Sequence, residues 1–342
     1  MQEFATYTVV GLVFGAIYAI GASGLVLTYT TSGIFNFAHG AQAMLGAFLY
    51  WQLTVAWGVP IPVAIVLVVG VFGPLLGVLL YQLLMKGLRD VEEVTKVVVT
   101  VSVLLGLVSL ATWMWPAGEN RTIAKLFGAQ SKVTIAGVSV SYHEILCVVA
   151  AVALAVGLRF VFVRTRLGVA MRAVVDDPDL LRLNGFNPDR IAMSSWAFGA
   201  AMAAFAGVII TPVAGGALDS TTLTLLVIDT FAAAMFGRLR SIPRTFVGAI
   251  VLGLIVTYFQ GYAPAQWDWV ANFKGAIPAI VLIVVLLLLP QDRLRGSRQS
   301  RSRERANVPT VRQAVVWAGV LVVCAVVPVS YTHLTLPTNR EV

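Results

Sequence analysis

Three regularly spaced polar residues are the clearest candidates for chemistry in the first quarter of this chain. Asn36, His39 and Gln42 lie three residues apart within a segment, Phe4 to Met85, that has no Asp, Glu, Lys or Arg. In a helix this spacing places them on one face. Buried without partners, they would cost several kcal/mol. Two hypotheses stay open: an element of a gate or pathway, or a satisfied structural network that breaks a helix and holds its end.

Asp229 is the other polar residue that stands out, because it lies in the apolar run from Leu225 to Phe236. An unpaired carboxylate there would be costly, so Asp229 should face protein or water. Proton coupling is one interpretation; an ion pair or a position nearer the interface is the other. The sequence has no GxxxxGK[ST] loop, no HExxH helix and no Cys/His metal-ligand spacing. We therefore expect no nucleotide hydrolysis by this chain, no metal site and no cofactor.

The composition indicates that lipid is the solvent for the elements that position these residues. Apolar residues make up 58% of the chain and charged residues 12%, and the mean hydropathy is +0.87. These values exclude a water-soluble enzyme. At about 20 residues per crossing, we expect an all-α, polytopic transmembrane helix bundle of eight or nine spans. The apolar runs are approximately 7–29, 33–57, 60–85, 94–115, 143–163, 191–213, 222–237, 245–260 and 273–290.

The distribution of charge predicts how the bundle is oriented. The net charge is +8, but the basic residues lie in short breaks between apolar runs, so nucleic acid is not an expected partner. If the chain crosses the membrane nine times with the N-terminus outside, nineteen Lys and Arg residues lie on the inner side and four on the outer side. Arg340 is not counted, because it belongs to the terminal string at 329–342. This bias satisfies the positive-inside rule. The uncharged turn at 30–33 leaves one alternative, in which the second run enters the membrane only halfway.

Small residues at four-residue spacing predict close helix packing. The examples are Gly11 with Gly15, Gly73 with Gly77, and Gly199 with Ala203 and Gly207. Such positions let two helix backbones approach each other in lipid. We interpret them as packing positions with no further function.

The longest inner segment, 164–190, holds five Arg and four Asp between two apolar runs. Its apolar residues have helical spacing, and Gly185 is placed to end a helix. The residues expected on the apolar face are Leu167, Ala170, Met171, Val174, Leu180, Leu181 and Leu183. A docking element for a cytoplasmic protein and a solvated charged loop are equally consistent with this pattern.

Three motifs carry a resemblance to a known family. Arg172-Ala173, followed by Asp176-Asp177 and by the LNGFN motif at 183–187, resembles the cytoplasmic coupling loop of ABC importer permeases of the branched-chain amino-acid type. The GIFNFAHG segment at 33–40 is similar to that family's "NFAHG" signature. The segment 198–207 resembles the Gly/Ala-rich helix that follows the loop. The resemblance extends from about residue 7 to residue 290.

The resemblance implies an H-type permease subunit in the plasma (inner) membrane of a prokaryote. Its partners would be an M-type permease half, two cytoplasmic ATP-binding subunits, an extracytoplasmic substrate-binding protein and membrane lipid. The solutes would be leucine, isoleucine and valine, or urea and amides as in relatives. The implied residues that couple to the ATPases are Arg172, Asp176, Asp177, Leu183, Asn184 and Gly185.

Two departures from the family pattern bear on the substrate more than on the mechanism. Asp229 stands where relatives commonly carry Lys, and the 237–243 turn has fewer glycines than theirs. A secondary transporter or channel is the alternative function, and it would require relayed charges or interrupted helices in both halves. A membrane-embedded enzyme would require an acid, base or metal cluster at membrane depth, which the sequence lacks.

The end of the chain differs in composition from the bundle. We expect the permease domain at 1–292 and a basic, disordered linker at 293–312, which is rich in alternating Arg and Ser. Residues 313–328 look like the start of a truncated second permease half. The string at 329–342 resembles the translation of a sequencing adapter, and we exclude it from the fold prediction.

Overall fold

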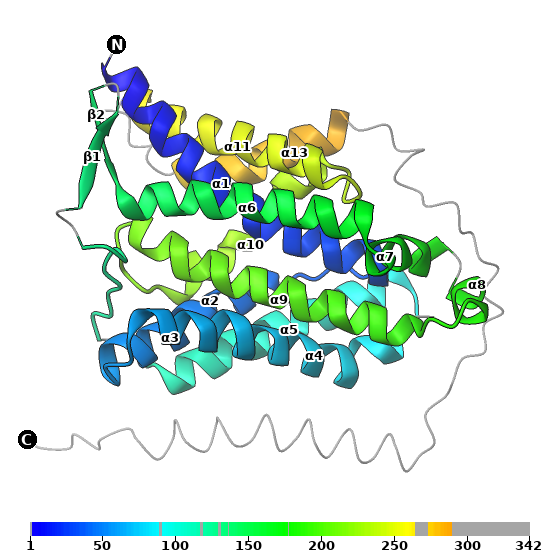
Figure 1. Cartoon of the computed structure of the whole chain (residues 1–342). Coiled ribbons are helices and arrows are strands. Elements are labelled where there is room, and N and C mark those ends of the chain that lie inside the picture. The colour runs from blue at the N-terminus through cyan, green and yellow to red at the C-terminus, as the bar shows by residue number, and fades with distance from the viewer. Residues whose placement is uncertain are drawn as a thin grey trace, which may run out of the picture. The chain divides into compact units, whose positions relative to one another are not determined.

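Each of the nine apolar runs forms a helical segment in the computed structural model (Figure 1), which describes residues 2–88, 91–116, 119–128, 131–135, 137–176, 178–263 and 273–288. The segments 293–312, 313–328 and 329–342 lie outside these ranges. The transmembrane elements are α1 (Gln2–Ser32), α2 (His39–Trp51) with η1 (Gln52–Ala56), α3 (Ile61–Ile65) with η2 (Val66–Phe72) and α4 (Gly73–Leu83), α5 (Glu93–Met114), α6 (Tyr142–Arg164), α9 (Pro188–Val213), α10 (Ser220–Phe236), α11 (Ile242–Tyr262) and α13 (Ile277–Leu288).

The expected all-α polytopic bundle is confirmed. Among the described residues, six helical segments are long and apolar enough to cross a membrane: 2–32, 61–83, 94–114, 142–164, 188–213 and 242–262. The helices α10 and α13 are apolar but shorter, with 17 and 12 residues, and the α2–η1 segment adds another short passage. These lengths are compatible with eight or nine passages, of which some do not span the full membrane thickness as helix.

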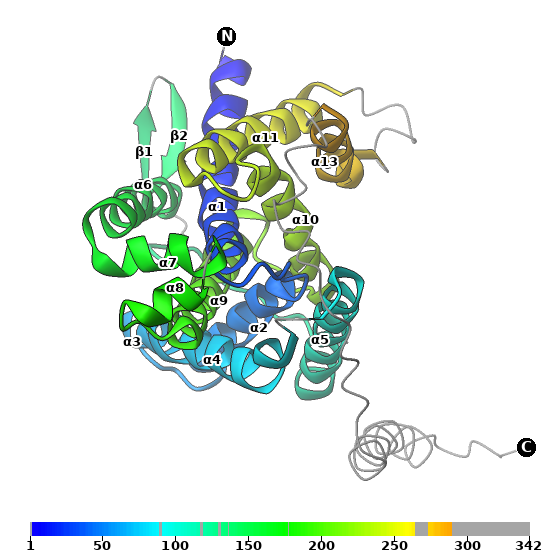
Figure 2. The same ribbon diagram turned by 90° about the vertical axis from the view of Figure 1, so that its right-hand side faces the viewer.

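The centre of the bundle is α1, which packs against α6, α9, α10 and α11 (Figure 2). Glycines permit this density, as expected. A Cβ atom at Gly15 would lie 2.7 Å from the Cα of Ile250, and one at Gly73 would lie 2.8 Å from the Cα of Ala201. Real Cβ atoms do not come so close, so the backbones meet only because these positions carry no side chain.

The connection between α1 and α2 is an extended segment inside the protein. Gly33 has a φ of 67°, which turns the chain back along α1, and residues 33–38 are not helical. The side chain of Phe35 packs on Phe231 of α10, with ring centroids 4.3 Å apart. The second apolar run is therefore helical only from residue 39 rather than from residue 33, and α2 begins at His39 beside the middle of α1.

The two ends of the bundle differ in structure and charge. One end carries the hairpin of β1 (Lys132–Ile135) and β2 (Val138–Ser141), in which Val133 pairs with Val140. There Ser141 caps α6, and Glu144 pairs with Lys125 at 2.6 Å. The opposite end carries η3 (Met85–Leu88), α7 (Arg166–Asp176), α8 (Pro178–Leu183) and the α10–α11 turn (Figure 1). We call these the hairpin end and the α7–α8 end.

Candidate functional site

The α7–α8 element is held against the bundle by its apolar side chains. Ala170, Met171 and Val174 are 2%, 2% and 4% exposed, and Leu181 is 6% exposed. The amphipathic prediction is confirmed for these four residues, and α7 contacts α1, α6 and α9. A Cβ at Gly168 would lie 2.5 Å from the Cα of Phe162, so α7 and α6 are in close backbone contact. This packing makes α7 a rigid extension of the helices beneath it.

The prediction is wrong for three other apolar residues of the same element. Leu167, Leu180 and Leu183 are 38%, 56% and 85% exposed. Leu167 lies in the first turn of α7, at the edge of its buried face. The exposure of the two leucines of α8 has a geometric reason: α8 has six residues, Pro178–Leu183, fewer than two helical turns, so its leucines point in different directions and only Leu181 reaches the bundle. Exposed leucines on a charged surface are unfavourable in water, which is typical of a surface that a partner covers.

A glycine in the left-handed backbone conformation shapes the turn after α8. Gly185 has a φ of 81°, and its N–H donates to the carbonyl of Arg182 while the N–H of Phe186 donates to the carbonyl of Leu181. This is the conformation that ends helices at glycine, as the sequence predicted. Asn187 then begins α9, because its side-chain oxygen accepts hydrogen bonds from the N–H groups of Asp189 and Arg190.

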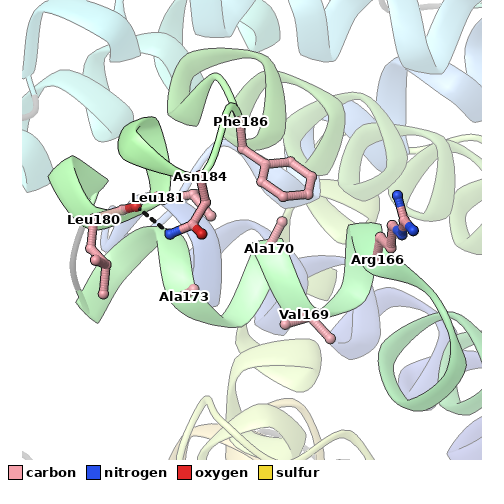
Figure 3. Close-up of a pocket in the computed structure, with 8 residues that line it drawn as sticks. All are labelled: Arg166, Val169, Ala170, Ala173, Leu180, Leu181, Asn184 and Phe186. Carbon is pink, nitrogen blue, oxygen red and sulfur yellow. Dashed lines mark hydrogen bonds between the residues drawn. The ribbon is translucent and has the colours of Figure 1, made fainter.

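A pocket of about 570 Å³ opens between α7, α8 and this turn (Figure 3). The ring of Phe186 lies over Ala170, and Arg166 lies at one side of the pocket. The side chain of Asn184 points toward α8 and donates to the carbonyl of Leu180 at 2.8 Å. The lining is mostly apolar, so the pocket suits an apolar side chain of a partner, with Arg166 able to bind a neighbouring carboxylate.

The six residues implied as coupling residues divide between two surfaces. Leu183, Asn184 and Gly185 lie together at the end of α8, beside the pocket. Arg172 is exposed on α7 but lines a different groove, between α6 and α11. Asp176 is the last residue of α7, and Asp177 lies outside the described residues. Sequence reasoning missed Leu180 and Phe186 as pocket residues; the signal was the presence of more apolar residues than so short a helix can bury.

The structure brings Asn36, His39 and Gln42 together in the interior, where each is 1% exposed. The His39 Nε2–H donates to the carbonyl of Gly21 in α1 at 2.8 Å, and Asn36 Nδ2 lies 3.4 Å from Gln42 Oε1. Three polar atoms of this cluster have no hydrogen-bond partner among the described residues: Asn36 Oδ1, His39 Nδ1 and Gln42 Nε2. The cluster thus joins α1 to the start of α2 but leaves both donors and acceptors unsatisfied.

Asp229 does not join this polar cluster. It lies on α10, where its neighbour Thr230 packs on Gly21, and it is close enough to Tyr18 of α1 for an electrostatic interaction. Within the described residues, no basic side chain forms an ion pair with Asp229. The described residues contain no group of three or more His, Cys, Asp or Glu side chains that could hold a metal ion.

Comparisons with known proteins agree on the family. Residues 7–286 match the family described as "Branched-chain amino acid transport system / permease component". The chain is 29% identical over 297 residues to the permease protein BraD of Pseudomonas aeruginosa, a high-affinity branched-chain amino acid transport protein, covering 82% of this chain and 92% of BraD.

Two further relatives come from other organisms. A probable branched-chain amino acid permease, LivH of Methanocaldococcus jannaschii, is 26% identical over 287 residues, covering 82% of this chain and 89% of LivH. The fructose import permease FrcC of Rhizobium meliloti is 26% identical over 255 residues, covering 70% and 66%. No solved structure matches this chain significantly. The family match covers the helical bundle, the segment 33–40 and the α7–α8 element. The chain therefore belongs to the branched-chain amino acid transport permease family.

Proposed function

We propose that this chain is the permease subunit of an ATP-driven importer in the inner membrane of a prokaryote, and that its solutes are branched-chain amino acids or related small molecules. The names of the LivH and BraD relatives support this solute class. The fructose permease among the relatives indicates that one scaffold serves chemically different solutes. We therefore assign selection chiefly to an extracytoplasmic substrate-binding protein. A second, M-type permease half would complete the translocation path.

The observation that carries the proposal is the exposed apolar surface at the α7–α8 end. Leu183 is 85% exposed beside a mostly apolar pocket, on an element whose opposite face is buried. Such a surface supports docking of a separate protein, and we assign it to the two cytoplasmic ATP-binding subunits. Because the sequence has no phosphate loop of its own, this chain is not an enzyme in the proposal, and its energy comes from those subunits.

The proposed mechanism uses α7 as a lever. Closure of the ATP-binding subunits would push the end of α8 and the Gly185 turn. Since α7 contacts α1, α6 and α9, the push would tilt these helices together and exchange outward-open and inward-open states. This orientation places the α7–α8 end in the cytoplasm and the hairpin end outside, in agreement with the charge distribution.

We further propose that Asn36, His39 and Gln42 belong to the gate that this movement opens. Their position supports the proposal, because three buried polar side chains meet at membrane depth where α2 begins beside α1. In the open state, water or solute would satisfy them. A Gln42→Cys variant should react with a water-soluble thiol reagent during ATP-driven turnover and not at rest. Ala47→Cys, buried on the same helix, should stay unlabelled; equal labelling of both positions would contradict a local gate.

The coupling assignment is tested at Gly185, whose φ of 81° disfavours any side chain. Gly185→Val should distort the turn, so that ATP hydrolysis continues while solute uptake falls at least tenfold. Gly87→Val is the matched control, since Gly87 lies at the same end with no atom within 4 Å of its Cβ position and no positive φ. A substitution of Asp177 should uncouple in the same way. Normal uptake in the Gly185 and Asp177 variants would contradict the docking role.

A further inference from the structure

The helices α6 and α11 lie on either side of α1 (Figure 2). A long furrow between them is lined by residues of α6, α11 and α1. It consists of two adjoining cavities of about 460 and 520 Å³ that share Ala155, Val156 and Phe246. The first extends toward the hairpin end as far as Glu144 and is almost entirely apolar. The second extends toward the α7–α8 end as far as Val163. From 144 to 163, α6 rises by roughly 29 Å, close to the thickness of a bilayer core.

The cavity at the α7–α8 end changes from apolar to basic at its mouth. Arg159 of α6, Arg172 of α7 and Arg240 of the α10–α11 turn all line it. None of these three arginine side chains forms an ion pair or hydrogen bond with another residue in the described ranges. Among the residues that the structure describes, no carboxylate lines this cavity. The hydroxyl-bearing side chains of Thr30 and Ser241 also line it. The Thr30 hydroxyl donates to the carbonyl of Leu27, so the arginines are the main hydrogen-bond donors at the mouth.

The turn that carries Arg240 has a strained backbone. Arg238 and Leu239 both have positive φ, 52° and 54°, although neither is glycine. Side chains rarely adopt this conformation, and two consecutive examples persist only where the surroundings impose them. Here the N–H of Leu239 donates to the carbonyl of Ala234 at 3.0 Å, and that of Arg240 donates to Gly237 at 3.1 Å. The strained turn holds Arg240 at the mouth of the furrow.

We propose that this furrow binds an anionic phospholipid of the cytoplasmic leaflet. The phosphate lies among Arg159, Arg172 and Arg240, and an acyl chain lies along Ala155, Val156 and Phe246. Charge complementarity selects this occupant: basic pockets between transmembrane helices suit anionic headgroups, and the groove that continues from this one is apolar. A free anion would fill the mouth only. The assignment to the cytoplasmic leaflet rests on the proposed orientation of the permease.

The proposed lipid would connect three elements of the transport machinery. Its phosphate would contact α6, α7 and the α10–α11 turn at once, and α7 is the proposed lever. Anionic lipid should therefore stiffen the link between the lever and the bundle. We expect coupling of ATP hydrolysis to uptake to improve as anionic lipid replaces neutral lipid in the membrane.

The test measures lipid binding by the assembled transporter, with phosphatidylglycerol and phosphatidylcholine as probes in mixed nanodiscs. The variant is Arg159→Gln with Arg240→Gln. The matched control is Arg164→Gln with Arg244→Gln, which removes two exposed arginines at the same end, from α6 and α11, that do not line the furrow. We expect the preference of the variant for phosphatidylglycerol over phosphatidylcholine to fall about 25-fold, which is about fivefold for each arginine removed. The control should keep it.

Several results would overturn the proposal. The parent transporter could retain the two lipids equally. The variant and the control could lose the preference for phosphatidylglycerol to the same extent. Inorganic phosphate alone could displace phosphatidylglycerol. Protection of Val156→Cys from a lipid-soluble thiol reagent by the second permease half, rather than by lipid, would assign the furrow to that half. If the double variant does not fold, Arg159→Gln and Arg240→Gln are measured singly. Lipid binding is measured without ATP and therefore does not depend on coupling. Failure of the proposed ATPase docking would instead appear in a separate measurement, as a loss of ATP-driven uptake.

Discussion

Truncation of Leu183 to alanine should separate the proposed docking from folding. The side chain is 85% exposed in this chain, so its removal should change the free energy of unfolding by less than about 0.5 kcal/mol. In the docked complex the same side chain should be buried. Leu183→Ala removes three carbon atoms at about 0.8 kcal/mol each, which gives about 2 kcal/mol after allowance for the part already buried. The affinity for the ATP-binding subunits should fall about 30-fold.

Leu181→Ala is the matched comparison on the same helix. Leu181 is 6% exposed, so its truncation should lower the stability of the permease by about 2–5 kcal/mol. Both variants are measured by thermal unfolding in detergent and by titration with the purified ATP-binding subunits. The reasoning is refuted if Leu183→Ala binds within twofold of the parent, or if it unfolds as easily as Leu181→Ala.

Three other substitutions have expected outcomes. The pKa of Asp219 lies below its usual value because the side chain and N–H of Thr222 donate to its carboxylate; Asp219→Ala should cost about 0.5–1 kcal/mol at neutral pH. Because a lowered pKa stabilises the fold only above the unfolded value, this difference should disappear as the pH falls below about 4 in unfolding experiments. Gly199→Val should destabilise the bundle by about 1–3 kcal/mol in thermal unfolding, since its Cβ would lie 2.5 Å from Thr28 Cγ2. Asp229→Asn should leave uptake and its pH profile unchanged in vesicles; a lost pH response would favour proton coupling.

Hydropathy was sufficient to predict the helical segments. A lipid-facing helix must be apolar over its length, and its connections must be polar, so both leave a direct trace in sequence. The late start of the second helix leaves only a weak trace, the uncharged turn at 30–33 that leaves a half-entering segment open as an alternative. Residues 33–38 carry no charge, so hydropathy places them in the span. In the structure α2 starts only at His39, whose side chain donates to the carbonyl of Gly21. That contact exists only after α1 and α2 have packed together.

The candidate site was predictable only in part. Helical spacing located the buried face of α7 correctly, because Ala170, Met171 and Val174 recur with the period of a helix. It did not predict that Leu183 is exposed, since α8 is too short for its spacing to define one face. The basic furrow was not predictable either, because its arginines come from three separate elements, α6, α7 and the α10–α11 turn.

Solute uptake into vesicles with and without the ATP-binding subunits tests the central claim most directly. The permease is reconstituted with its second half and its binding protein, and uptake of radiolabelled leucine is followed with ATP, without ATP, and without the ATP-binding subunits. We expect accumulation only when both ATP and those subunits are present. Accumulation at the same rate in their absence would contradict the account and indicate a secondary transporter or channel.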